Sequence, residues 1–222
     1  MNPAQSSKNN KMLLISIKND ILLFILLKKK ANRKEGKYMN KDDIRVIKTA
    51  KSIHQAFFSL LEEKDYQEIT IQDILDVAQI NRTTFYKHYA NKDALAKQLV
   101  EEFKHTIFFP ILERRFNESS LEFIQKEAPL MLRNKEIIRL LWKIETSKIH
   151  LKQDMYQLIK RQYIEALSKE TIDNELIDLE FQGHIYASLA LASISFSFDL
   201  EQEVNPLHLL ENLKMLFQRA IL

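Results

Sequence analysis

A short stretch of the chain, from Asn81 to Lys92, carries cations and hydrogen-bond donors but no acidic residue. Its basic side chains are Arg82, Lys87, His88 and Lys92. Lys and Arg neutralise phosphate groups, and Arg also makes paired hydrogen bonds with planar acceptors such as guanine. These residue types, gathered in so few positions, favour the binding of a polyanion at one small surface.

The rest of the sequence gives no general electrostatic support for such a partner. The whole chain has a formal net charge of +3. Residues 1–38 contain nine Lys and Arg against Asp20 and Glu35, a net charge of +7, so the remaining 184 residues have a net charge of −4. A small basic surface on a mildly acidic body is what we expect of a protein that touches a nucleic acid at one edge.

The basic stretch belongs to a pattern of short helices. Apolar residues recur at steps of three and four over residues 41–63, which predicts an amphipathic helix. Thr70, with Asp73 three residues later, predicts the start of a second helix, and Asn81 predicts the start of a third. Two short helices joined by a tight turn, the second rich in Thr, aromatic and basic residues, form the layout of a helix-turn-helix DNA reader.

The remainder of the chain predicts more helices. Only two glycines and four prolines interrupt a sequence rich in Leu, Ile, Lys and Glu, which is typical of long helices. Asn91 is expected to cap a helix that runs past Phe103, with Pro110 at its end or at a kink. Further helices are expected at residues 119–133 (bent or broken at Pro129), 135–145, 147–169, 174–199 and 206–221.

We therefore predict an all-α fold: an N-terminal three-helix helix-turn-helix domain at residues 39–91, followed by a helical bundle at residues 92–222 that dimerises. Residues 1–38 differ in character, and their longest uninterrupted apolar run, Ile21–Leu27, is far too short to span a membrane. Met39 stands directly before the first well-patterned helix, so we expect translation to start there. A weakly ordered tail and contact with a membrane surface are the alternatives.

The helix-turn-helix segment also carries a specific string of residues. The string is Asn81-Arg82-Thr83-Thr84-Phe85-Tyr86-Lys87-His88-Tyr89, followed by Lys92-Asp93 and preceded by Arg45, Ala50, Phe57, Thr70-Ile71-Gln72-Asp73-Ile74 and Ala78. With these residues the chain resembles the TetR (tetracycline-repressor-like) family of bacterial regulators over about fifty residues. The family usually has Gly in the turn where this chain has Gln79. We expect either a left-handed Gln79, at a cost of roughly 1 kcal/mol, or a turn of slightly different construction.

The resemblance and the chemistry of the residues together assign DNA contacts. Side chains in the first turn of the third helix can reach base edges, where Arg pairs with guanine and a Thr methyl packs on thymine. The predicted base contacts are Arg82, Thr83, Thr84 and Lys87, of which Lys87 could serve a phosphate instead. The predicted phosphate contacts are Thr70, Tyr86, His88 and Lys92. Phe85 and Tyr89 are expected to face the three-helix core.

In this family the C-terminal domain is a dimer and often holds an effector pocket. We predict the pocket from the aromatic and Met side chains of the second domain, although such residues are more often plain core: Phe108, Phe109, Met131, Trp142, Tyr156, Tyr163, Phe181 and Tyr186. The segment 176–198 is apolar over much of its circumference, which predicts burial by more than its own chain. With residues 206–221 it forms the predicted dimer interface, at Leu189, Ser193, Ile194, Phe196, Leu209, Leu213 and Leu216.

Catalysis and cofactor binding find no support in the sequence. The chain has no cysteine, its six histidines show no i, i+4 pair, and no Gly-rich loop is present to hold phosphates. We predict a cytoplasmic, sequence-specific transcription regulator without a cofactor or membrane contact. It would be a repressor that binds a palindromic double-stranded DNA operator as a homodimer. A small-molecule or protein effector would release it from the DNA. The alternative is a helical interaction module, or a ligand- or partner-binding protein, that has lost DNA binding.

Overall fold

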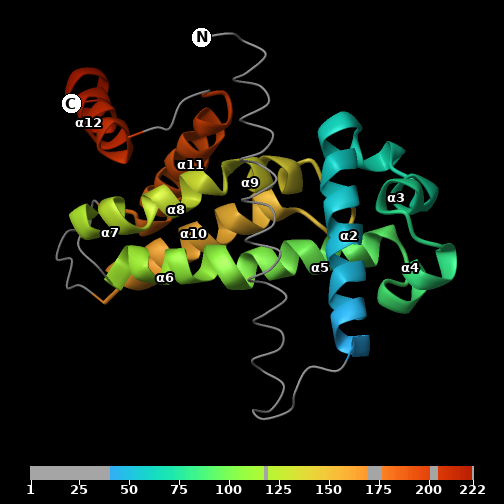
Figure 1. Cartoon of the computed structure of the whole chain (residues 1–222). Coiled ribbons are helices and arrows are strands. Elements are labelled where there is room, and N and C mark those ends of the chain that lie inside the picture. The colour runs from blue at the N-terminus through green and yellow to red at the C-terminus, as the bar shows by residue number, and fades with distance from the viewer. Residues whose placement is uncertain (1–40, 118–119, 170–176, 201–204, 222) are drawn as a thin grey trace, which may run out of the picture. The chain divides into compact units, whose positions relative to one another are not determined.

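The computed structural model describes residues 41–117, 120–169, 177–200 and 205–221 (Figure 1). Every regular element in these ranges is helical, which confirms the predicted all-α class. The expectations for residues 1–38 and for Met39 fall outside these ranges. Within them, no helix combines the length and the apolar character that crossing a membrane requires.

The chain divides into two compact units. The first extends to Glu102 and also includes Lys143–Glu145, and the second contains Phe103–Trp142 and the chain from Thr146 onward. Most of helix α5 thus groups with the first unit, whereas the sequence prediction began the second domain at residue 92. The elements of the first unit are α2 (Lys41–Glu63), the 3-10 turn η1 (Tyr66–Glu68), α3 (Ile71–Ala78), α4 (Arg82–His88) and α5 (Lys92–Phe103).

Local capping sets where the short helices begin. The backbone N–H of Asp73 donates to Thr70 Oγ1 at 3.1 Å, and the backbone N–H of Thr70 donates to Asp73 Oδ2 at 2.8 Å. This capping box starts α3. Asn81 Oδ1 accepts from the backbone N–H of Thr84 at 2.8 Å and starts α4, and Asn91 caps α5 in the same way. All three predicted helix starts are confirmed.

The turn between α3 and α4 depends on one left-handed residue. Gln79 has φ 53° and ψ 47°, and its N–H donates to the carbonyl oxygens of Leu75 and Asp76 at the end of α3. Ile80 N also donates to the carbonyl oxygen of Leu75, at 3.1 Å. The turn therefore has the first of the two expected geometries, with a left-handed Gln79. This residue carries a side chain in a backbone conformation that favours glycine.

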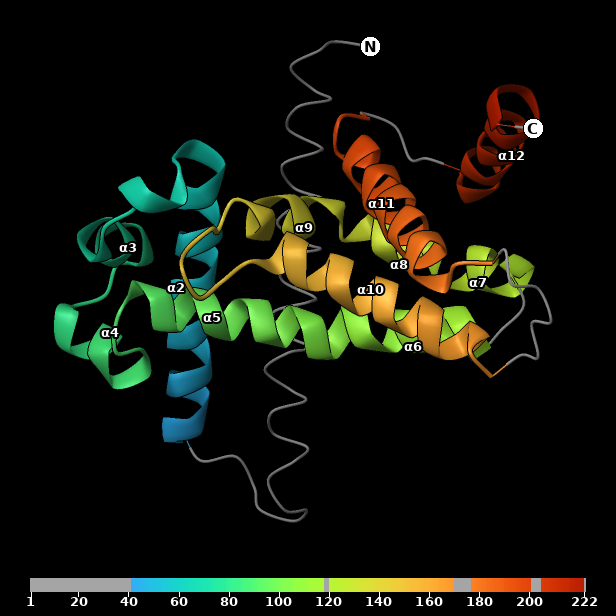
Figure 2. The same ribbon diagram turned by 180° about the vertical axis from the view of Figure 1, so that it is seen from behind.

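Helix α4 is held to its unit by Phe85. A helix of seven residues has little stability of its own, so burial of an apolar face must hold it in place. Phe85 is completely buried, as are Phe57 and Leu61 on α2 and Ile74 on α3. Figures 1 and 2 show α3 and α4 on the same side of α2. Phe85 and the buried Tyr89 face the core as predicted.

The second unit is a bundle in which α10 and α11 lie side by side (Figure 2). Their close approach depends on Gly183, because a Cβ atom there would lie 3.0 Å from Ile164 Cγ1 on α10. The elements of this unit are the π-helical segment η2 (Lys104–Phe108), α6 (Phe109–Asn117), α7 (Ser120–Lys126), α8 (Ala128–Arg133), α9 (Lys135–Trp142), α10 (Leu151–Leu167), α11 (Leu179–Phe198), α12 (Pro206–Leu216) and η3 (Phe217–Ile221).

Two prolines act differently from the sequence prediction. Pro110 does not end its helix: a π-helical segment precedes it, in which the N–H of Phe109 donates to the carbonyl oxygen of Lys104. Because Pro110 has no N–H to donate and its ring crowds the preceding turn, widening that turn lets the helix continue. The predicted break at Pro129 lies earlier, at Glu127, and Pro129 occupies the first turn of α8, where its missing N–H costs nothing.

The helix predicted at residues 147–169 begins later, at Leu151. The hydroxyl oxygen of Thr146 accepts hydrogen bonds from the backbone N–H groups of Lys148 and Ile149, at 3.1 Å and 3.0 Å. This local turn competes with helix formation, since Ser and Thr side chains satisfy backbone donors outside helices.

The strained turn yields a stability prediction. We expect Gln79→Gly to raise the free energy of unfolding by about 0.5–1 kcal/mol, because glycine tolerates the left-handed conformation and part of the gain is lost to its freedom in the unfolded chain. Urea denaturation of the full chain measures the change. Gln79→Ala keeps a Cβ atom and is expected to show no such gain, so equal stabilisation by both substitutions would contradict the prediction.

Candidate functional site

The outer surface of α4 brings the four predicted base contacts together. Arg82 and Thr83 are exposed and Thr84 is half-buried in the first turn of the helix, and Lys87 is exposed in its last turn. Phe85 is the only buried side chain of the helix. The arrangement thus offers a guanidinium, two hydroxyls and an ammonium on one short helix, with a single apolar anchor behind them.

Tyr86 and His88 extend this surface. Tyr86 is 47% exposed and meets the ring of Phe85 edge-on, with the ring centroids 5.7 Å apart. His88 is half-buried and stacks on Tyr89. Burial lowers the pKa of His88 in the chain without DNA, whereas a phosphate beside the imidazole would favour its charged form. Both roles as phosphate contacts remain predictions.

Thr70 lies beside a carboxylate. Its hydroxyl donates to Asp73 Oδ2 at 2.9 Å, and hydrogen bonds from Thr70 keep the pKa of Asp73 below its usual range. Lys64 Nζ lies 3.2 Å from the other carboxylate oxygen of Asp73. A phosphate at Thr70 would therefore approach an ionised Asp73 as well as the free amides of the helix start, a competition that the sequence alone does not show.

Lys92 is held inside its own unit. Its Nζ donates to the backbone carbonyl oxygens of Tyr66 and Ile69, each at 2.7 Å, and lies 4.3 Å from the centroid of the Tyr66 ring. The Tyr66 hydroxyl in turn donates to the carboxylate of Asp93. Burial lowers the pKa of Lys92 although Asp93 and Asp73 act in the opposite direction. The phosphate contact predicted for Lys92 would require its ammonium to exchange a carbonyl for a phosphate oxygen.

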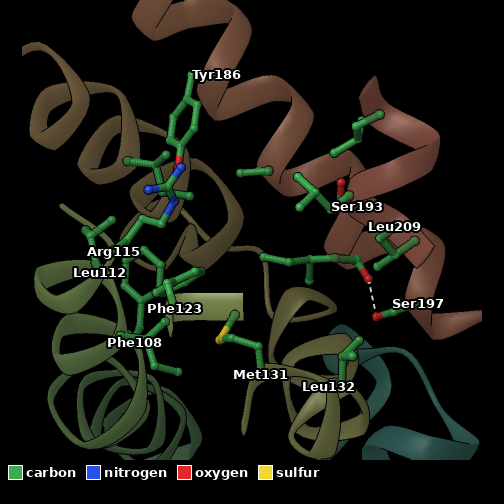
Figure 3. A pocket seen from close by; sticks show the side chains of 16 residues that line it. Phe108, Leu112, Arg115, Phe123, Met131, Leu132, Tyr186, Ser193, Ser197 and Leu209 are labelled. Atoms are coloured by element: carbon green, nitrogen blue, oxygen red, sulfur yellow. Dashed lines mark hydrogen bonds between the residues drawn. The ribbon is translucent and has the colours of Figure 1, made fainter. Parts of the chain in front are cut away.

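The second unit contains a cavity of about 250 Å³ (Figure 3). Its walls come from η2, α6, α7, α8, α10, α11 and α12, and they are mostly aliphatic and aromatic. Three of the predicted pocket residues line it: Phe108, Met131 and Tyr186. The cavity has the size and apolar character of a small-molecule site. Within the described ranges, no group of His, Asp and Glu side chains is arranged to hold a metal ion.

The other five predicted pocket residues do not line the cavity; four of them contact other side chains of the second unit, and Phe181 is exposed. Trp142 Nε1 donates to Met155 Sδ at 3.4 Å, and the indole meets Phe198 edge-on. Phe181 is 63% exposed. The remaining three do not line the cavity: Tyr156 is hydrogen-bonded to His184, Tyr163 donates to Gln182 Oε1 at 3.0 Å and stacks on Tyr186, and Phe109 packs against His105.

Several residues that line the cavity were not predicted from the sequence, and Arg115 is the charged one among them. It follows Glu113 and Arg114 on α6, and three successive charges look like a solvated helix face. Helical periodicity could have placed Arg115 on the same face as Ile111 and Leu112, which precede it by four and three residues. No signal in the sequence shows that this face borders a cavity.

The predicted dimer residues divide into two groups. Ser193, Ile194, Leu209 and Leu213 line the cavity. Phe196 is 55% exposed and Leu216 is 46% exposed, and Leu189 is half-buried. The helices predicted to dimerise therefore also form one wall of the cavity, and the exposed apolar side chains are those available to a second copy.

The sequence matches a known family over the helix-turn-helix segment. Residues 53–99 fit the model of the bacterial regulatory proteins of the tetR family. The HTH-type transcriptional regulator YxbF of Bacillus subtilis is 30% identical over 157 residues, which cover 68% of this chain and 39% of YxbF. The A-factor receptor protein of Streptomyces griseus is 31% identical over 65 residues, 29% of this chain and 24% of the receptor.

A third relative is the transcriptional activator DhaS of the dhaKLM operon in Lactococcus lactis, 36% identical over 55 residues, 25% of this chain and 29% of DhaS. The chain thus spans about two fifths, or less, of the length of these relatives. Two crystal structures of a γ-butyrolactone receptor (ArpA-like protein) share the fold, with TM-scores of 0.50 and 18% identity. They cover 68% and 79% of this chain, and 84% and 89% of their own.

Together, the all-helical architecture, the exposed short helix after a tight turn and these relatives define a helix-turn-helix protein. The chain belongs to the TetR family of bacterial regulatory proteins, and its relatives are transcriptional regulators and not enzymes.

The position of Lys92 leads to a prediction that distinguishes two roles of its ammonium group, stabilising the fold and contacting a DNA phosphate. We expect Lys92→Met to lower the free energy of unfolding by about 1–3 kcal/mol, because it leaves carbonyl oxygens of the η1 region without a donor. Urea denaturation measures the change, and Lys87→Met, at an exposed position, is the matched control with an expected effect within about 0.5 kcal/mol.

The salt dependence of DNA binding provides the second measurement on Lys92→Met. If the ammonium only supports the fold, the slope of log affinity against log salt stays that of the parent chain. A slope reduced by about one would instead establish the phosphate contact. Unchanged stability in Lys92→Met would contradict the supporting role.

Proposed function

We propose that this protein is a transcription repressor that binds a palindromic DNA operator as a homodimer and is released when an effector occupies its second unit. The observation that carries the proposal is the surface of α4, which exposes Arg82 and Lys87 while Phe85 alone anchors the helix. In a helix-turn-helix protein this helix enters the major groove. The match of residues 53–99 to the tetR family includes α4.

The order of side chains along α4 supports direct reading of bases. Arg82, Thr83 and Thr84 form the first turn, the part of a recognition helix that meets base edges. Arg82 would pair bidentately with a guanine, and the Thr methyl groups would contact thymine. Tyr86 and His88, on the same short helix, would donate to phosphates and fix its position along the groove.

A homodimer would present two copies of α4 to two half-sites of the operator. The exposed apolar side chains of α11 and α12 support this arrangement, because a protein that functions alone rarely exposes so many large apolar side chains on two helices. Phe196 and Phe181 on α11, with Leu207, Met215 and Leu216 on α12, are the exposed ones. A two-fold dimer would use the same surface on both copies and imposes its symmetry on the operator.

The cavity supports release by an effector. Its volume of about 250 Å³ exceeds the roughly 150 Å³ of an engineered cavity that binds benzene. The fold shared with a γ-butyrolactone receptor supports a receptor role, which we assign to the second unit because the cavity lies there. A ligand would release DNA only if it bound the non-binding conformation more tightly than the DNA-binding one.

Selection of DNA fragments by the purified full chain tests whether the surface of α4 recognises bases. We expect a palindromic motif of two short half-sites. Arg82→Ala should relax the preference at one or two positions of each half-site, at about 1–3 kcal/mol per lost base contact. Tyr86→Ala should weaken binding to all sequences alike, since a phosphate contact carries no sequence information.

Two outcomes would contradict this proposal. A folded, dimeric chain that enriches no sequence would favour the alternative of a helical interaction module without DNA binding. A motif left unaltered by Arg82→Ala would remove this residue from the base contacts. Because the Lactococcus relative is an activator, a reporter gene placed under the selected operator decides the direction of regulation, and loss of reporter expression on adding the regulator is expected.

Light scattering on purified variants tests the dimer. We expect Phe196→Glu or Leu216→Glu to produce a monomer, because a carboxylate at an apolar interface would be buried without a partner. Both residues are exposed in the single chain, so the substitutions should not impair folding. Val46→Glu, at another exposed apolar position, on α2, is the control and should remain dimeric. A Phe196→Glu chain and a Leu216→Glu chain that both stay dimeric would place the interface elsewhere.

A further inference from the structure

The cavity of the second unit contains one charge. Among the sixteen residues that line it, Arg115 is the only charged one, and the polar ones are Tyr186, Ser193 and Ser197. The hydroxyl of Ser193 donates to the carbonyl oxygen of Leu189 at 2.9 Å, and that of Ser197 to Ile194 at 2.6 Å. Both serines thus use their protons within α11. Strong polar recognition of a ligand is therefore concentrated at Arg115 and Tyr186.

Arg115 lies among aromatic rings. Its guanidinium carbon is 5.6 Å from the ring centroid of Phe116, 5.4 Å from that of Phe123 and 5.5 Å from that of Tyr186. Figure 3 shows the guanidinium directed toward the Tyr186 hydroxyl. The rings hold the planar group in place and leave its other N–H groups available.

Arg115 also differs from its neighbour in the sequence. Arg114 Nη2 lies 2.7 Å from a carboxylate oxygen of Glu127 and is thereby neutralised. In the part of the chain that the structure describes, no carboxylate forms an ion pair with Arg115. A cation in a mostly apolar cavity is stabilised most by an anion that reaches it, and an Arg binds a carboxylate through two parallel hydrogen bonds.

We propose that the effector is an amphiphilic carboxylic acid, whose carboxylate pairs with Arg115 and whose alkyl chain fills the apolar remainder of the cavity. This inference rests on the proposed function in so far as the cavity is the effector site. Phe108, Met131 and Leu213, from three different elements, would contact the alkyl chain, and Tyr186 would contribute its hydroxyl at the acidic end. The volume of about 250 Å³ suits a chain of medium length.

Selectivity follows from the same geometry. A neutral alcohol or ester of equal chain length would bury the same apolar surface but could not neutralise the guanidinium. Hydrogen bonds to charged groups contribute more than neutral ones, enough for about a ten- to hundred-fold preference for the acid. Arg115 causes this preference, which should therefore disappear when Arg115 is replaced by an uncharged residue.

Isothermal titration of the full chain with decanoate, decanol and methyl decanoate at neutral pH tests the proposal. We expect decanoate to bind at least about ten-fold more tightly than the two neutral probes. Arg115→Met should reduce decanoate binding to the level of decanol and leave decanol binding nearly unchanged. Arg161→Met, on the exposed side of α10, is the matched control and should retain the preference of the parent chain.

Three outcomes would overturn the proposal: equal or tighter binding of a neutral probe, decanoate binding unaffected by Arg115→Met, or no binding of any probe. The comparison of probes on the parent chain needs no variant, so a poorly folded Arg115→Met chain would not prevent a decision. Ala190→Phe, which fills the cavity from α11, should abolish binding of decanoate and decanol alike if both occupy it.

The DNA-binding assay on the same samples separates this inference from the proposed function. Decanoate that binds with the expected selectivity but leaves the operator complex intact would support the ligand class and contradict effector release. If a neutral lactone released the operator and decanoate did not bind, the result would support the proposed function. It would overturn the inference that the effector is a carboxylic acid.

Discussion

The burial of Phe85 is the constraint on which the helix-turn-helix unit depends. Helix α4 has seven residues, and Phe85 is its only buried side chain. A helix this short is unstable alone, so its orientation depends on the packing of this one ring in the core of the first unit. Because Phe85 alone anchors α4, its other six positions are available for polar groups. A small helix can thereby offer many contacts to a nucleic acid.

Part-buried hydrogen bonds stabilise the elements around α4. Lys92 gives its ammonium to the carbonyl oxygens of Tyr66 and Ile69, while Tyr66 is bonded to Asp93. These contacts fix the start of α5 against the chain that leads into α3, and α3 sets the turn at Gln79. A charge that sequence similarity would assign to phosphate therefore also has a role inside the fold, because a buried carbonyl group without a donor is costly.

The second unit combines two roles in the same helices. On α11, Ser193 and Ile194 line the cavity, whereas Phe196 is exposed to solvent. α12 likewise places Leu213 on the cavity and Leu216 outside. A ligand that repacks the inner face would therefore act on elements that also present the proposed dimer surface. This shared use of α11 and α12 gives the proposed effector a physical connection to dimer geometry, as differential binding to two conformations requires.

The sequence by itself determined the helical class, the helix starts at Thr70, Asn81 and Asn91, and the left-handed turn as one of two geometries, because caps and turns depend on residues close in the chain. Together with the resemblance to the TetR family, it also placed Phe85 in the core. Only the tertiary structure decided the partners of long side chains. Trp142 meets Met155 and not the cavity, and Arg115 borders the cavity although its neighbours suggest a solvated face. Periodicity gives the direction in which a side chain points, but what it meets there depends on how distant helices pack.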